Sequence, residues 1–237
     1  MKERLHKVIA QRGFCSRRAA EKYIAEGKVT VDGKMAQIGD VVEAETAVIT
    51  VCGTPVLAAQ EKMRYIMLHK PRGVVTTVKD EQNRPTVMGL IADVEERVYP
   101  VGRLDMYSEG LLLLTNDGEL ANRLTHPSHE IYKEYLLRIR APKEIDPVAA
   151  LSAPMQLDGR ALAPAMVKKI RDEGEDVLLS VKIREGRNRQ IRRMCEQYDF
   201  TVKTLKRIAV GKLKLDRLPC GKWRNLETDE IDYLKSL

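Results

Sequence analysis

One charged loop stands out among the residues whose types and spacing could carry out chemistry. Val101 and the run Leu111–Leu114 read as apolar strands, and Arg103, Asp105 and Glu109 lie between them. Catalytic groups tend to lie on loops that rigid strands hold in place. Asp105 is therefore our candidate catalytic carboxylate. The alternative, an aspartate that caps its own backbone in a turn, is at least as well supported by the spacing alone.

The segments around this loop predict a mainly antiparallel mixed sheet with flanking helices. Strands outnumber helices, and the two do not alternate strictly, which is typical of the α+β class. Helices are predicted at residues 119–124, 146–151, 187–197 and 229–235. Strands are predicted at residues 65–68, 74–78, 98–101, 111–114, 131–140, 177–184 and 201–210.

The start of the chain predicts a separate, small α-α-β module. Leu5, Val8 and Ile9 have helical spacing, Ser16 is a suitable N-cap for a second helix, and Asp32-Gly33 is typical of a tight hairpin. Gly53-Thr54-Pro55 and the residues after it read as a connection. We therefore expect a module at residues 1–55, a linker at 56–63 and a larger domain at 64–237.

Charge is concentrated in two parts of the chain. The net charge is +7, and residues 1–35 carry a net +5 while residues 182–214 carry +8, so the rest of the chain is acidic. Two separate basic clusters on an otherwise acidic chain favour a polyanion that is bound at two places. Neither cluster has the large apolar helix face that binding to an anionic membrane would need.

Several other classes of protein are disfavoured by the sequence. The longest uninterrupted run of strongly apolar residues, Leu111–Leu114, is far shorter than the ~20 residues of a membrane helix. Met1–Lys7 lacks the apolar segment of a signal peptide. The four cysteines form no Cys-x-x-Cys pair, so the usual zinc spacing is absent. We expect a cytoplasmic protein without a metal site.

Four motifs follow one another along about residues 62–237: His69–Gly73, Gly102–Asp105 with Ser108–Gly118, Lys133–Tyr135 and Glu185–Met194. Together they resemble the motifs of bacterial ribosomal RNA pseudouridine synthases that act on small- or large-subunit uridines. Met106-Tyr107 departs from the Asp/Asn-Thr pair that is usual in this family, which puts local loop contacts in question but not the aspartate.

The first 55 residues separately resemble a small RNA-binding module first described in a small-subunit ribosomal protein. The match rests chiefly on Ser16–Glu21, Gly27 and Val31-Asp32-Gly33. A helix-turn-helix that enters a DNA major groove is the competing interpretation, because it also begins with two helices and a glycine turn. The hairpin directly after the second helix favours the ribosomal type.

The resemblance implies that the protein isomerises a uridine within RNA, with one essential aspartate and no metal or organic cofactor. Asp105 would attack the nucleoside or assist departure of the base, and the two routes stay open. Tyr135 would stack on the target uracil and could act in proton transfer, and the alternative is that it is an ordinary core residue. Arg192 would be the cation that keeps Asp105 ionised, since a neighbouring positive charge lowers the pKa of a carboxyl. The alternative for Arg192 is a simple phosphate contact.

The remaining candidates are cations for the RNA. In the module they are Arg4, Arg17, Arg18 and Lys22. In the larger domain, Lys70 and Arg103 are expected to position RNA or to brace the pocket, and Arg187, Arg189 and Arg193 to bind it. The expected partner is ribosomal RNA or a ribosomal assembly intermediate, with no membrane, and the protein is expected to be a monomer. Residues 121–128 favour large-subunit over small-subunit RNA.

Two alternatives belong to other functional classes. Asp105 and Glu109 could be the paired carboxylates of a glycoside hydrolase. However, a sugar cleft usually needs aromatic platforms, and the chain is only 5% aromatic with one tryptophan. A non-catalytic RNA-binding protein of ribosome assembly is the other alternative, although binding alone would not require Asp105, Tyr135 and Arg192 together.

Overall fold

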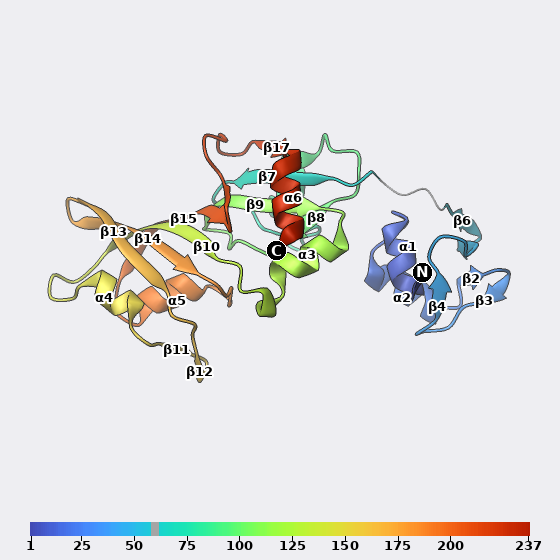
Figure 1. Ribbon diagram of the computed structural model, residues 1–237, viewed down its shortest axis with the longest axis horizontal. Helices are drawn as coiled ribbons and strands as arrows, with labels where there is room; N and C mark the ends of the chain where they lie inside the picture. The colour runs from blue at the N-terminus through green and yellow to red at the C-terminus, as the bar shows by residue number, and fades with distance from the viewer. Residues whose placement is uncertain (58–61) are drawn as a thin grey trace. The chain divides into compact units, whose positions relative to one another are not determined.

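The computed structural model describes residues 1–57 and 62–237, which divide into two compact units, Met1–Met63 and Arg64–Leu237 (Figure 1). Each unit has a hydrophobic core of its own. The molecule is of the α+β class, with a small N-terminal unit and a larger unit that is built on one mixed sheet. No helix in the described part of the chain is long and apolar enough to span a membrane.

The N-terminal unit packs two helices against short strands. Ser16 accepts a hydrogen bond from the backbone N–H of Ala19 at 3.1 Å and so caps the second helix as predicted. Asp32 and Gly33 both have positive φ, 49° and 80°, as a two-residue hairpin turn requires. The elements are β1 (Lys2–Arg4), α1 (Leu5–Gln11), α2 (Arg17–Ala25), β2 (Val29–Val31), β3 (Lys34–Met35), β4 (Val41–Glu43), β5 (Ile49–Val51) and β6 (Thr54–Val56).

The strand β6 lies where the sequence predicted the start of a connection. It is the edge of a four-stranded sheet ordered β3-β2-β5-β6, and an edge strand tolerates Pro55. Val56 is buried in the N-terminal core, and its carbonyl accepts a hydrogen bond from Arg12 Nη1 at 3.1 Å. Val56 therefore belongs to the N-terminal unit. The rest of the predicted linker includes residues 58–61, which lie outside the described residues.

The larger unit is organised by a nine-stranded sheet whose main path is β13-β14-β10-β15-β9-β7-β17. Its strands are β7 (Tyr65–Lys70), β8 (Tyr99–Val101), β9 (Glu109–Thr115), β10 (Lys133–Arg140), β13 (Met166–Glu173), β14 (Asp176–Ile183), β15 (Thr201–Val210), β16 (Leu213–Lys214) and β17 (Trp223–Asn225). A separate small hairpin is formed by β11 (Gln156–Leu157) and β12 (Arg160–Ala161). The helices are η1 (Val87–Ile91), α3 (Gly118–Thr125), η2 (Pro127–His129), α4 (Pro147–Ser152), α5 (Gln190–Glu196) and α6 (Thr228–Ser236).

Two cores cover opposite faces of this sheet. On β9, Leu112 and Leu114 belong to one core while Leu111 and Leu113 belong to the other. The first core is completed by η1, α4 and α5, and the second by α3 and α6. Burial on both faces explains why this strand is an unbroken apolar run rather than an alternating pattern.

The two halves of the sheet meet where β9 runs parallel to β15, while every other pairing described is antiparallel. Only two residue pairs form this seam, Lys206 with Glu109 and Arg207 with Gly110. A Cβ atom at Gly110 would collide with the backbone of Arg207, lying 2.7 Å from its nitrogen. Gly110 also has φ +111°, so glycine meets both requirements of the seam.

Several elements differ from the sequence prediction, which did not include η1, β11, β12, β16 or β17. Residues 74–78 form no strand but a single bridge from Val75 to Thr86. The strand β13 was missed because it is an exposed edge rich in charge, which is a common device against edge-to-edge pairing. The helix α5, predicted to start at residue 187, begins at Gln190, because Arg189 is in the left-handed conformation with φ 50°.

Candidate active site

The loop that carries Asp105 is fixed through its backbone. Lys70, the last residue of β7, is fully buried, and its ammonium donates hydrogen bonds to four carbonyl oxygens. Three of these belong to the loop, at 3.2 Å to Asp105, 3.4 Å to Met106 and 2.9 Å to Ser108. In addition, the N–H of Gly73 donates to the Met106 carbonyl at 2.8 Å. The path of the chain through residues 105–108 is therefore set from inside the protein.

Lys70 was predicted either to position RNA or to brace the pocket, and its contacts favour bracing. A fully buried ammonium that donates to four carbonyls is not available to a phosphate. Burial lowers the pKa of Lys70 to about 8, although the negative charge of Asp105 opposes the shift.

Arg192 approaches the same loop from α5. Its Nη2 donates to the Tyr107 carbonyl at 2.8 Å and to the Ser108 hydroxyl at 3.4 Å. Burial lowers the pKa of Arg192, Asp105 raises it, and the positive charges of Arg189 and Arg72 lower it. The guanidinium thus interacts electrostatically with Asp105, while its hydrogen bonds hold the loop rather than the carboxylate. Its Nε is buried and has no hydrogen-bond partner.

Tyr135 lies in a row of residues that crosses four neighbouring strands. On β10 it pairs with Arg207 of β15, which pairs with Gly110 of β9, which pairs with Lys70 of β7. Neighbouring strands are about 4.8 Å apart. Tyr135 therefore lies only a few strand spacings from Lys70, which holds the backbone of Asp105. Tyr135 is buried in the core that also contains Leu104 and Ile191, the chain neighbours of Asp105 and Arg192.

Two further cations lie beside this row. Arg207 is buried, and its Nε donates to the Leu111 carbonyl at 2.7 Å. Lys133 lies two residues before Tyr135 on β10. Burial, followed by the positive charge of Arg207, lowers the pKa of Lys133 to about 8. Together with Lys70 and Arg192, whose charges interact with that of Asp105, these cations give the site a positive charge that attracts a polyanion.

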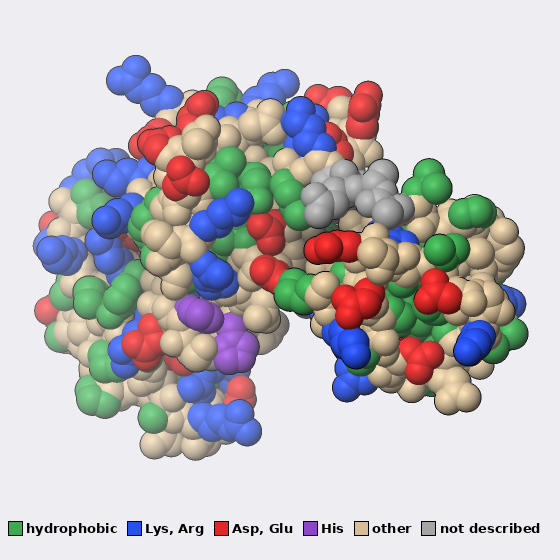
Figure 2. Space-filling view, turned by 45° about the vertical axis from the view of Figure 1, so that its right-hand side comes forward, with side chains coloured by type: hydrophobic (Ala, Val, Ile, Leu, Met, Phe, Trp, Pro, Cys, Tyr) green, Lys and Arg blue, Asp and Glu red, His purple; other side chains and the backbone are tan. Residues whose placement is uncertain are grey.

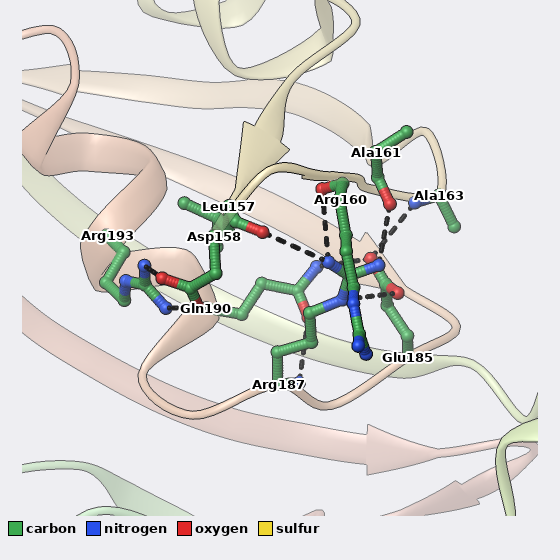
Figure 3. A network of polar contacts seen from close by, with 9 residues as sticks. All are labelled: Leu157, Asp158, Arg160, Ala161, Ala163, Glu185, Arg187, Gln190 and Arg193. Carbon is green, nitrogen blue, oxygen red and sulfur yellow. Dashed lines mark hydrogen bonds and ion pairs between the residues drawn. The ribbon is translucent and has the colours of Figure 1, made fainter.

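Two arginines of the segment Glu185–Met194, Arg187 and Arg193, hold the β11–β12 hairpin (Figure 3). Arg187 donates to the carbonyls of Arg160 and Ala161, at 3.1 and 2.6 Å, and pairs with Glu185 at 3.2 Å. Arg193 makes two hydrogen bonds to the carboxylate of Asp158 at the hairpin turn, at 2.9 and 2.7 Å. The sequence assigned both arginines to RNA, whereas these contacts attach β11–β12 to the segment that leads into α5.

The other predicted RNA contacts are more accessible. Arg103 and Arg189 are exposed, and Arg189 pairs with Glu196 at 3.1 Å. In the N-terminal unit, Arg17, Arg18 and Lys22 are exposed along α2. Arg17 lies 2.9 Å from a ring nitrogen of His6, and Lys22 lies 3.8 Å from Glu26. Arg4, also exposed, donates to the Gly39 carbonyl at 2.6 Å.

Sequence reasoning gave no role to Arg207, Lys133, Ser108 or Arg72. For Arg207 a signal was present, since it alternates with the buried Leu205 and Ala209 and should therefore point inward. Lys133 belongs to the Lys133–Tyr135 motif, of which the sequence analysis used only Tyr135.

Among residues 1–57 and 62–237, no group of three His, Cys, Asp or Glu side chains could hold a metal ion.

Surface charge alone does not mark the site. In Figure 2, the Lys and Arg side chains on the visible face of the larger unit are dispersed and interspersed with acidic side chains. The ion pairs of Arg184 with Glu130 and of Lys182 with Glu134 are examples of such mixing. The loop geometry is therefore the stronger evidence.

The comparisons with known proteins agree with the fold. Residues 64–197 match the family model described as RNA pseudouridylate synthase, and residues 3–48 match the S4 domain. A protein of Bacillus subtilis named ribosomal large subunit pseudouridine synthase B is 40% identical over 99% of this chain and 96% of its own length. An uncharacterized RNA pseudouridine synthase of Aquifex aeolicus is 39% identical over 99% of this chain and 94% of its own length.

A solved structure extends the likeness to three dimensions. The crystal structure of a pseudouridylate synthase aligns with a TM-score of 0.68 and 31% identity, covering 98% of this chain and 99% of that one. The fold and the site thus define an RNA-modifying isomerase with an S4 RNA-binding domain. The chain belongs to the RNA pseudouridine synthase family.

Proposed function

We propose that the protein converts a specific uridine of large-subunit ribosomal RNA to pseudouridine, with Asp105 as the essential carboxylate. The observation that carries this proposal is the backbone brace of Lys70 and Arg192, which fixes residues 105–108 through hydrogen bonds in which the Asp105 carboxylate takes no part. The choice of RNA is supported by the relatives named for the large ribosomal subunit.

The residues of this site fit the reaction. The carbon–nitrogen bond between base and sugar breaks, the uracil turns, and a carbon–carbon bond to the same sugar forms, while the ring carbon that makes this bond loses its proton and the released ring nitrogen gains one. Asp105 attacks the nucleoside or assists departure of the base, and Arg192 interacts electrostatically with this carboxylate. Tyr135 stacks on the uracil, as an extruded base requires. The S4 domain contributes affinity through phosphate contacts of Arg4, Arg17, Arg18 and Lys22 on the exposed surface of the domain.

The decisive experiment replaces the carboxylate without changing its size. We expect Asp105→Asn to abolish product formation on large-subunit RNA while binding stays close to wild type, because phosphate contacts carry most of the affinity. Glu109→Gln is the matched control and should keep most of the activity. Chemical mapping of pseudouridine measures the product, and a filter-binding assay measures the affinity.

Each outcome has a definite meaning. Product from Asp105→Asn at a rate near wild type would refute the assignment of the aspartate. An equal loss in Glu109→Gln would favour paired carboxylates. Wild-type protein that binds ribosomal RNA but forms no pseudouridine would indicate a non-catalytic role in ribosome assembly. We further infer a cytoplasmic monomer, which light scattering of the purified protein and fractionation of the cells that make it will test.

A further inference from the structure

Tyr107 combines a fixed backbone with a free side chain. Its carbonyl accepts the 2.8 Å hydrogen bond from Arg192, and the next residue, Ser108, is buried and held by Lys70. Yet the side chain of Tyr107 is 60% exposed. A large aromatic ring in water gains nothing for the fold, so a role outside the protein accounts for it better than a role in packing.

The position of Tyr107 relates it to the reaction. It follows Asp105 by two residues, so the two Cα atoms are at most about 7 Å apart. A uridine that reaches Asp105 must leave its own stack, and the adjacent base then loses a stacking partner. Arg72 and Arg189, whose charges both act on Arg192, supply positive charge for the backbone of the same strand.

We propose that the ring of Tyr107 stacks on the RNA base next to the target uridine and thereby stabilises the strand from which the uridine has been extruded. This inference rests on the proposed function, because it requires a uridine at Asp105. Aromatic rings stack on any base and contribute substantially to binding of single-stranded RNA. Because Lys70 and Arg192 already hold the backbone, stacking needs to order little more than one side chain.

The side chain at position 107 is independent of the brace. At Met106-Tyr107 the sequence departs from the pair of residues that its motif otherwise suggests. The brace around the loop does not depend on the identity of either side chain, since its hydrogen bonds from Lys70, Gly73 and Arg192 go to backbone carbonyls at 106 and 107. The side chain at 107 can therefore vary without moving the aspartate.

The test compares Tyr107→Ala, Tyr107→Phe and wild type on a large-subunit RNA fragment in which the wild-type target has been mapped. We expect kcat/KM of Tyr107→Ala to fall by about 5- to 100-fold, chiefly through KM, and Tyr107→Phe to stay near wild type. Tyr132→Ala, which removes another exposed tyrosine (36% exposed) of the same domain, is the control and should change little. Circular dichroism melts verify that each variant is folded.

A second set of RNAs identifies the base. The fragment is made with an abasic site at each position flanking the target. On the RNA that lacks the stacked base, Tyr107→Ala should cost nothing further relative to wild type. An equal loss on every abasic RNA, a failure of Tyr107→Phe to rescue, or wild-type kinetics for Tyr107→Ala would each overturn the proposal. Absence of product from the wild-type protein would instead refute the proposed function.

Discussion

The two basic regions of this chain look alike in sequence but differ in structure. In residues 1–35, Arg18 and Lys22 lie exposed on α2 and are free to meet a phosphate. In residues 182–214, Arg187 and Arg193 hold a hairpin, and Arg207 is buried against a neighbouring strand. The first region thus presents charge to a ligand, while much of the second uses charge to build the site.

The difference shows that positive charge has two separate uses in this protein. A cation that binds RNA should affect the salt dependence of binding, because it displaces counterions. A cation that holds backbone carbonyls should affect stability and turnover and leave that dependence alone. Salt slope and unfolding free energy therefore distinguish the two uses residue by residue.

The largest effect is expected for Lys70, the most completely engaged cation. Lys70→Met keeps the volume but removes a donor from four carbonyl oxygens, of which that of Met106 retains the N–H of Gly73. We expect the free energy of unfolding to fall by about 2–5 kcal/mol, and turnover to fall with it, because buried unsatisfied acceptors are costly. Urea unfolding measures the change in the free energy of unfolding. Unchanged stability with a shallower salt slope would place Lys70 with the RNA-binding cations instead.

The pKa of Lys70 predicts a dependence of stability on pH. Burial lowers this pKa from 10.5 to about 8. Between these values the folded protein has released the proton and the unfolded chain still holds it, so the free energy of unfolding must rise with pH. Relative to Lys70→Met, the wild type should gain up to about 1.4 kcal/mol per pH unit above pH 8.

Urea unfolding of both proteins at pH 7, 8, 9 and 10 tests this dependence. Lys133, whose pKa is also lowered to about 8, is present in both proteins and so does not contribute to the difference. A difference between wild type and Lys70→Met that stays constant or shrinks above pH 8 would contradict a lowered pKa.

A moderate effect is expected in the S4 domain. Replacing Arg17, Arg18 and Lys22 by alanine should weaken RNA binding and make the plot of log affinity against log salt shallower by about 0.7–0.9 per lost contact. The catalytic unit should melt as in wild type. The control removes Lys168, Lys169 and Arg171 from the exposed edge strand β13, taking away the same charge. An equal change in slope for both triple variants would show that only total charge matters.

The smallest effect is expected for Arg193→Ala. The side chains of Arg193 and Asp158 are 28% and 73% exposed, and exposed ion pairs contribute little to stability. The salt slope should not change, because this guanidinium is already engaged by a carboxylate. If Arg193→Ala changed the slope of log affinity against log salt as much as Arg18→Ala does, Arg193 would have to be counted among the residues that bind RNA.

Local patterns predicted much of the fold. The Ser16 cap, the Asp32-Gly33 turn and the long alternating strand that became β10 were readable because neighbours in sequence determine them. The charged edge strand β13 and the short β17 gave no such pattern. The seam of β9 with β15 joins residues far apart in sequence through a close backbone approach, which no local pattern predicts.

The candidate site, like the fold, was predictable from the sequence only in part. The motifs indicated Asp105, Tyr135 and Arg192 and assigned their surroundings to RNA. They could not show that Lys70 binds carbonyls of the catalytic loop, or that Arg187 binds carbonyls of the β11–β12 hairpin. An unpaired cation and a bracing cation look the same in sequence, because only the fold supplies the acceptors.

The seam of β9 and β15 also bears on the biosynthesis of the protein. β9 ends at Thr115, but its parallel partner β15 starts only at Thr201. The partner of β7 on its other side, β17, starts only at Trp223. While the chain is being made, two strongly apolar strands therefore have open edges, which invite pairing with other chains. Translation that stops before Thr201 should yield aggregated protein rather than a smaller soluble one. The nascent enzyme, lacking Arg192 and β15, should also be inactive until most of the chain has left the ribosome.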